Sequence, residues 1–237
     1  MESKKNEFDN FDQFAKEYRD IHNENIKITG ADSEYFAQNK VEIVAEYLDK
    51  NQSLKLLDFG CGDGISLQLF HKLLPNIQLA GIDVSSESIA EAAARNLPGA
   101  ELKPFDGFII PFEANLFDVV FVANVFHHID HKNHPQVCAE IYRILKPGGT
   151  LFIFEHNPYN PVTRKIVRDC VFDEDAVLLP PPYTIKLLQA AGFLQAKNHF
   201  TLFFPRSVVF KPFLSLEKWM RRLPIGGQYF CKAVKAK

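Results

Sequence analysis

A glycine-rich turn between an apolar segment and a helix constrains the fold of this chain more than any other feature. Residues 54–59 are predicted to form a short buried strand, and residues 65–74 a helix that ends at Pro75. The Gly-x-Gly-x-Gly sequence at 60–64 joins them. Glycines in such a turn let the backbone bend tightly and approach a ligand closely, and the following helix N-terminus favours negative charge. The sequence therefore predicts a ligand-binding loop in an α/β protein.

An acidic residue follows at the spacing expected of a nucleoside-binding site. Asp83 ends the predicted strand 78–83 and lies 19 residues after Gly64 (83 − 64). A carboxylate there can accept hydrogen bonds from both ribose hydroxyls of an adenosine, as in NAD or S-adenosylmethionine (SAM). The Gly-x-Gly-x-x-Gly spacing of dinucleotide sites is absent. Asp58, just before the loop, is placed to order a loop that receives a cationic amino-acid tail, which favours SAM.

Strands and helices alternate along the rest of the chain. Further strands are predicted at 117–123, 150–154, and near 195–204 and 227–234. Further helices are predicted at about 87–96 with Ser85 or Ser86 as cap, from Pro135 to the 146–149 turn, and from a Thr184 cap to Gly192. This alternation implies βαβ crossovers and a mostly parallel sheet.

The remaining segments suggest additions to that core. Residues 1–50 are predicted to form an N-terminal helical cap or substrate lid, and residues 51–237 the core, with insertions at about 156–183 and 205–226. The 203–225 stretch mixes aromatic and basic residues, as in a lid, a dimer face or an interfacial membrane helix. Pro205 and Pro212 interrupt such a helix and favour a lid, although a homodimer stays open.

Composition excludes several classes of protein. Hydrophobic residues make up 46% and charged residues 24%, typical of a globular protein, and the net charge of 27 − 29 = −2 provides no basic field for nucleic acid. The four cysteines form no Cys-x-x-Cys pair, and no apolar run is long enough for a transmembrane segment. We expect a cytoplasmic protein that does not bind nucleic acid.

Four segments in order resemble the class I SAM-dependent methyltransferases: 56–64, 81–85, 117–129 and 144–151. The resemblance implies a Rossmann-like fold with a seven-stranded, mostly parallel sheet and helices on both faces. It also implies SAM as cofactor and S-adenosylhomocysteine (SAH) as product. It assigns the methionine part of SAM to Gly60, Cys61 and Gly62 and to Asn124 and Val125. It assigns the ribose to Asp83 and the adenine to Val84 and Asp106.

Histidines cluster after the predicted fourth strand. The cluster of His127, His128, His131 and His134 resembles a metal site, and the last three have helical spacing. A zinc site needs convergent side chains and usually closes with cysteine or a carboxylate, and residues 130–135 favour a loop, so no metal is expected. The His-His-Ile sequence is frequent in the family at the substrate end of this strand. His128 is therefore a candidate general base, and His156, after the fifth strand, is a second candidate.

The acceptor is predicted to be a small molecule that is apolar or contains a ring. Aromatic residues of the predicted pocket favour this class: Tyr35, Phe36, Tyr159, Phe172 and Tyr183. Enzymes that methylate amino groups of nucleic acid bases carry an Asn/Asp-Pro-Pro-aromatic motif after the fourth strand. Here the similar Asn157-Pro-Tyr sequence follows the fifth strand, so methylation of a base is disfavoured. The alternatives are a catalytically inactive SAM-binding relative and a nicotinamide-dependent oxidoreductase.

Overall fold

The computed structural model describes residues 32–170, 173, 176–205 and 210–237. Most of the predicted N-terminal cap, residues 1–31, and the predicted pocket residue Phe172 lie outside the described residues. Within the described ranges, no helix has the length and apolar character needed to cross a membrane.

Seven strands form one sheet in the order β3-β2-β1-β4-β5-β7-β6. Their bounds are β1 Lys55–Phe59, β2 Gln78–Asp83, β3 Glu101–Pro104, β4 Phe117–Ala123, β5 Leu145–His156, β6 Leu194–Thr201 and β7 Gln228–Val234. Strands β1 to β5 pair in parallel, and β7 is antiparallel to both β5 and β6. The strand order reverses between β1 and β4, and open α/β sheets bind ligands at the carboxyl ends beside such a switch point.

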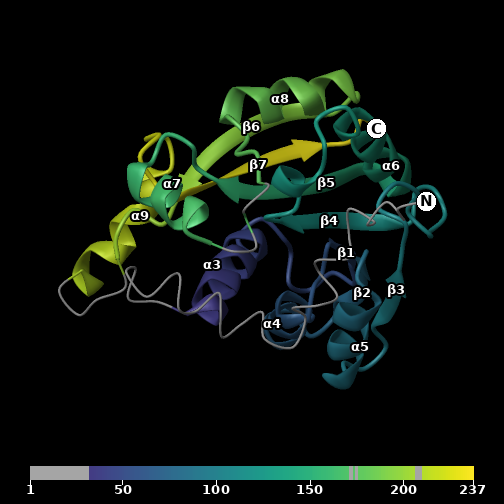
Figure 1. The fold of residues 1–237 in the computed structure, drawn as a ribbon. Coiled ribbons are helices and arrows are strands. Elements are labelled where there is room, and N and C mark those ends of the chain that lie inside the picture. Colours follow the sequence, from purple (N-terminus) through teal and green to yellow (C-terminus); the bar gives the residue numbers. More distant parts are fainter. Residues whose placement is uncertain (1–31, 171–172, 174–175, 206–209) are drawn as a thin grey trace, which may run out of the picture.

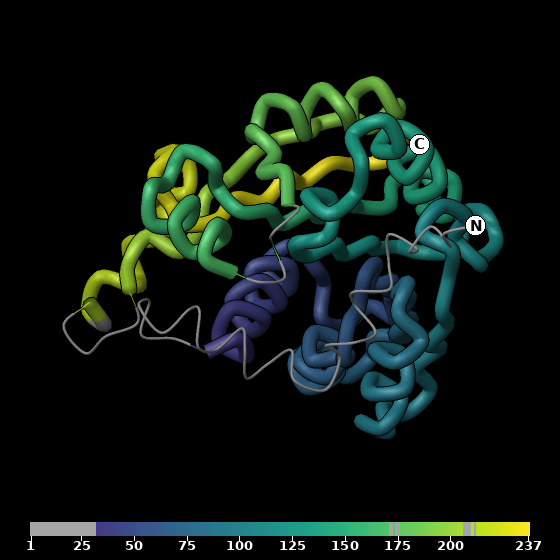
Figure 2. The backbone as a smooth tube through the Cα atoms, in the orientation of Figure 1, coloured from purple at the N-terminus to yellow at the C-terminus, as the bar shows by residue number. Residues whose placement is uncertain are grey.

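Helices cover both faces of the sheet (Figures 1 and 2). They are α3 Ser33–Ala45, α4 Ile65–Leu73, α5 Ser86–Ala94, α6 His134–Ile144, α7 Pro161–Arg168, α8 Pro181–Ala190 and α9 Glu217–Met220, with the 3-10 helices η2 Phe126–His128 and η4 Lys211–Leu216. Alternate strand residues point to opposite faces. Leu56 and Phe121 pack with α3 and α4, whereas Leu57 and Val120 pack with α6 and α8. The predicted Rossmann-like fold is confirmed.

Local sequence explains most element boundaries, and one prediction was wrong. The Ser85 hydroxyl accepts a hydrogen bond from the Ser88 N–H and caps α5, as predicted. Thr184 does not cap α8, which begins three residues earlier at Pro181. Proline suits the first helical position because its missing N–H is not needed there. Thr184 is instead buried, and its hydroxyl lies 2.7 Å from the Tyr229 hydroxyl.

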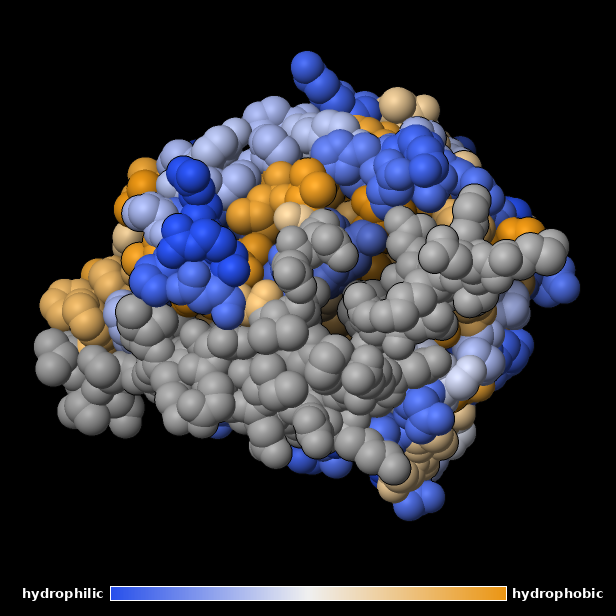
Figure 3. All heavy atoms as spheres, viewed as in Figure 1, coloured by the Kyte–Doolittle hydropathy of each residue, from blue (hydrophilic) through white to orange (hydrophobic). Residues whose placement is uncertain are grey.

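The two predicted insertions contain short helices at one end of the sheet. The first holds α7, and the second holds η4 and α9 (Figure 1). The second exposes large apolar side chains, and orange and tan atoms gather at the left of Figure 3. The exposed residues are Phe213, Leu216, Trp219, Leu223 and Ile225. The roles of these segments as lids stay predictions.

Candidate functional site

The glycine loop joins β1 to α4 through a left-handed backbone. Gly60, Gly62 and Gly64 have φ of 74°, 50° and 78°, which glycine adopts without steric cost. The Gly60 and Cys61 N–H groups both donate to the Ile82 carbonyl of β2, at 2.8 and 2.9 Å. A Cβ on Gly60 would lie 2.5 Å from Val125 Cγ2, so only glycine lets this loop approach the end of β4. The predicted residues Gly60 and Val125 are therefore in direct contact.

Asp83 orders the loop from the neighbouring strand. Its carboxylate accepts hydrogen bonds from the Gly62 N–H at 2.8 Å and the Ser85 N–H at 2.9 Å. Val84 follows it and is half-buried. These contacts bring three of the predicted residues, Gly62, Asp83 and Val84, to one edge of the sheet.

Asp106 lies two residues beyond the end of β3, which is paired with β2 through Asp83 and Pro104. It is exposed and accepts hydrogen bonds from the N–H groups of Phe108 and Ile109. These backbone hydrogen bonds lower the pKa of its carboxyl. Asp106 is therefore at the same sheet edge as Asp83, but it forms a tight local turn.

Two buried oxygen atoms in the site lack a hydrogen-bond partner among the described residues. They are Asp58 Oδ2, in β1, and Asn124 Oδ1, directly after β4. Burial raises the pKa of Asp58 well above its ordinary value, and the negative charges of Asp83 and Asp63 raise it further. A buried acceptor without a donor is costly, so each such atom needs an explanation. A cationic donor that reached these oxygens would satisfy them.

Arg95, which caps the C-terminus of α5, supports the loop, and no sequence pattern pointed to it. Its guanidinium donates to the Asp63 backbone carbonyl, to Asp63 Oδ2 at 2.8 Å and to Gln68 Oε1 at 2.9 Å. An arginine fork can hold several acceptors in one plane. Arg95 therefore ties the outer part of the loop to α4 and α5.

A buried histidine–carboxylate pair lies beside the loop, at the carboxyl ends of β4 and β5. His127 Nδ1 is 2.5 Å from Glu155 Oε2, and Glu155 Oε1 accepts from the Phe126 N–H at 2.9 Å. Glu155 is 0% exposed and His127 is 2% exposed. Burial lowers the pKa of His127, but the charges of Glu155 and Asp173 outweigh it and raise the pKa to about 9. Neither His127 nor Glu155 was predicted to be a site residue. The signal that could have pointed to them is that the adjacent parallel strands β4 and β5 both end at this place.

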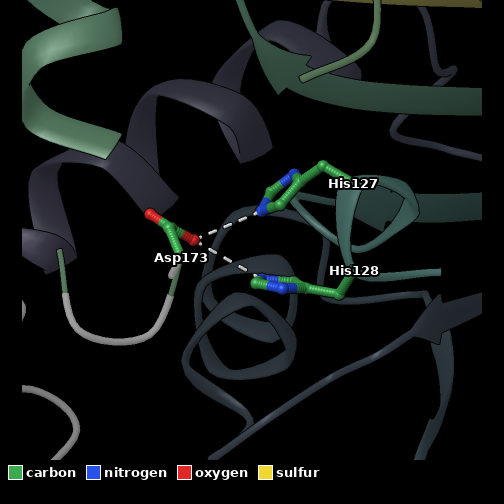
Figure 4. Close-up of side chains that lie close together, drawn as sticks. All are labelled: His127, His128 and Asp173. Carbon is green, nitrogen blue, oxygen red and sulfur yellow. Dashed lines mark ion pairs between the residues drawn. The ribbon is translucent and has the colours of Figure 1, made fainter. Parts of the chain in front are cut away.

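Asp173 approaches both histidines from the segment after α7 (Figure 4). Its Oδ1 lies 3.4 Å from His127 Nε2 and 3.5 Å from His128 Nε2. Burial and the neighbouring His127 charge lower the pKa of His128 to about 3, so its imidazole is neutral at pH 7. The His156 ring centroid lies 5.2 Å from that of His127. The two predicted catalytic histidines thus flank His127.

The other histidines of this segment have different surroundings. Both ring nitrogens of His134 are within 2.9 Å of a partner, the Tyr183 hydroxyl and the Phe126 carbonyl. His131 stacks on Tyr183. His134 therefore holds η2 and α8 together, and the i, i+3, i+6 spacing does not converge on one point.

Comparison with known proteins identifies the fold. Residues 57–153 match the methyltransferase domain family. A ubiquinone/menaquinone biosynthesis C-methyltransferase of Desulfotalea psychrophila is 31% identical over 105 residues, 44% of this chain and 42% of the relative. A demethylmenaquinone methyltransferase of Thermotoga maritima is 30% identical over 150 residues, 63% of this chain and 61% of the relative. The chain thus spans less than two thirds of the length of either relative.

Solved structures agree with the sequence relatives. A SAM-dependent methyltransferase from Thermotoga maritima has a TM-score of 0.68 and 20% identity, covering 96% of this chain and 99% of that chain. The fold and the loop define a Rossmann-like protein with a nucleoside cofactor. Together with the domain match, they show that residues 57–153 form a methyltransferase domain of the class I, SAM-dependent type. The predicted family and its cofactor are confirmed, whereas the residue assignments stay predictions.

Proposed function

We propose that this protein transfers the methyl group of SAM to a small acceptor that is apolar or contains a ring. The proposal rests on two buried oxygens without a hydrogen-bond partner among the described residues: Asp58 Oδ2 in β1, and Asn124 Oδ1 directly after the adjacent strand β4. The amino-acid end of SAM carries an ammonium group, which donates hydrogen bonds and positive charge. It would offset the burial that raises the pKa of Asp58.

The remaining cofactor residues follow from the same placement. Gly60, Cys61 and Gly62 line the methionine part of SAM. The space beside Gly62 is open, since a Cβ there would meet no atom within 4 Å, and a ligand can occupy it. Asp83 binds the ribose hydroxyls from its place beside the loop, and Val84 flanks the adenine. Asp106 binds the adenine amino group through its carboxylate, whose Oδ1 atom already accepts from the N–H groups of Phe108 and Ile109.

SAM supplies an activated methyl group, so the protein's main tasks are to align the acceptor and exclude water. The acceptor site lies at the carboxyl ends of β4 and β5, beside His128 and His156. Two quinone-pathway relatives support a ring-containing acceptor. With a pKa of about 3, His128 is a weak base, so deprotonation of an acceptor falls to His156 if one is needed.

The test is transfer of labelled methyl from SAM to a panel of hydroxylated and quinol ring compounds. We expect turnover with at least one acceptor. His156→Ala should lower kcat by about 100-fold or more if it acts as a base, with SAH affinity unchanged. Turnover that survives in both His128→Ala and His156→Ala would sink the role of a histidine base. SAH binding without turnover on any acceptor would favour the catalytically inactive relative.

A further inference from the structure

We propose that His127, His128 and Asp173 form a binding site for a divalent transition-metal ion, and that Zn²⁺ is the ion that fits it. The Nε2 atoms of both histidines face one carboxylate oxygen, Asp173 Oδ1 (Figure 4). One ligand atom from each residue lies within 4.8 Å of the other two. Among the described residues, these three are the histidine, cysteine and acidic side chains whose possible metal-binding atoms lie this close together.

Two of the three separations fit a shared ion better than hydrogen bonds, and the third, between the two histidine atoms, is within 4.8 Å. The two Nε2–Oδ1 distances are 3.4 and 3.5 Å, longer than the ~2.7–3.2 Å of an N–H···O hydrogen bond. Tetrahedral zinc with bonds of about 2.0–2.1 Å holds its ligand atoms about 3.4 Å apart. The two measured separations match that value. An octahedral ion with the same bonds would draw neighbouring ligands to about 3.0 Å.

The atom of His127 that faces Asp173 is buried and forms no hydrogen bond within the described part of the chain. The His127 side chain is 1% exposed, and Nε2 has no hydrogen-bond partner within the described part of the chain. Its other ring nitrogen, Nδ1, is bound by Glu155 Oε2 at 2.5 Å. Histidine ligands of metals commonly donate this second N–H to a carboxylate, which fixes the ring and leaves the other nitrogen for the ion. Glu155 provides that carboxylate.

A proton is the competing occupant of the site. Without a metal, a protonated His127 lies between Glu155 and Asp173 and pairs with both. Binding of the ion would expel that proton, because imidazole binds a metal through an unprotonated ring nitrogen.

No metal was predicted from the sequence, because the histidine spacing and the loop at 130–135 gave no sign of convergent side chains. The carboxylate that closes the proposed site comes from a distant segment, after α7. Two imidazoles and one carboxylate leave a coordination position open, as in catalytic zinc sites. That position would take water or, on the assumption of the proposed function, an oxygen of the acceptor. The binding itself does not depend on the proposed function.

The experiment is calorimetric titration of the full chain with Zn²⁺ after removal of metals by a chelator. Co²⁺ titration followed by visible absorption gives a second readout of ligand geometry. We expect one ion per chain with a micromolar or lower Kd, and an intense Co²⁺ band typical of tetrahedral sites. Asp173→Ala and His128→Ala should each weaken binding at least 10-fold. His71→Ala, which changes a histidine of α4 away from the cluster, should leave it unchanged.

Circular dichroism of each variant checks that the fold is retained, and SAH binding by the same samples is measured in parallel. Equal Zn²⁺ affinity in the parent protein, Asp173→Ala and His128→Ala would overturn the proposal, as would failure of the parent protein to bind Zn²⁺. SAH binding without Zn²⁺ binding would reject the metal site alone. Zn²⁺ binding without SAH binding would reject the proposed function alone.

Discussion

Replacing Glu155 with leucine is expected to lower the free energy of unfolding by about 3–5 kcal/mol, the cost of breaking a buried charge pair by removing one partner. Glu155 is 0% exposed and serves two donors, the Phe126 N–H and His127 Nδ1. Leucine would leave both donors unsatisfied and His127 without its carboxylate in a buried setting. Urea denaturation of the parent protein and the variant measures the difference.

Glu155→Gln is the matched control for this prediction. Its amide oxygen can still accept from the Phe126 N–H, and its size is nearly that of glutamate. We expect a smaller loss, about 1–3 kcal/mol, because only the charge and the His127 contact are changed. A loss below about 1 kcal/mol for Glu155→Leu would contradict the account of this pair as a buried, mutually stabilised unit.

Replacing Lys40 with methionine is expected to stabilise the protein at pH 7. Lys40 is 5% exposed in α3, and within the described part of the chain its Nζ donates a long hydrogen bond, 3.5 Å, to the Phe36 carbonyl. Burial lowers its pKa from 10.5 to about 8, against the attraction of Glu155. At about 1.4 kcal/mol per pKa unit, keeping this ammonium charged in the folded protein costs up to about 3 kcal/mol. Methionine keeps the chain length without the charge.

The gain should depend on pH in a defined direction. Because the folded protein holds the Lys40 proton less tightly than the unfolded chain, the parent protein gains stability as pH rises from about 8 towards 10.5. We therefore expect Lys40→Met to add about 1–3 kcal/mol at pH 7 and less at pH 10. Lys72→Met, at an exposed position of α4, is the control and should change little. An equal gain at both pH values, or a loss at pH 7, would contradict this explanation.

The sequence predicted best where neighbouring residues decide the structure. The loop glycines, Asp83 at the end of β2 and Ser85 as a helix cap all follow from local spacing and strand ends. The strand order follows from the alternation of strands and helices together with the family resemblance. Thr184 was misassigned because two prolines at 181 and 182 can begin a helix as well as a threonine can cap one.

The contact of His127 and His128 with Asp173 could not be predicted from local sequence patterns. Asp173 meets His127 and His128 only because the chain after α7 returns to the carboxyl end of β4. Glu155 stands next to the selected His156, but successive strand residues point to opposite faces, and the choice between them needed the three-dimensional structure. Arg95 likewise reaches the loop through a long side chain from another helix. Such contacts depend on tertiary packing, which carries no periodic signal.

Calorimetric titration with SAH measures whether the glycine loop and Asp83 hold the adenosine and methionine parts of SAM. We expect a micromolar Kd, about −8 kcal/mol. Asp83→Ala should weaken it about 100-fold or more, because it removes the ribose acceptor and the hydrogen bonds to the Gly62 and Ser85 N–H groups. Asp130→Ala, at an exposed acid, should bind SAH as the parent protein does. Absence of SAH binding, or binding of NADH in its place, would contradict the account.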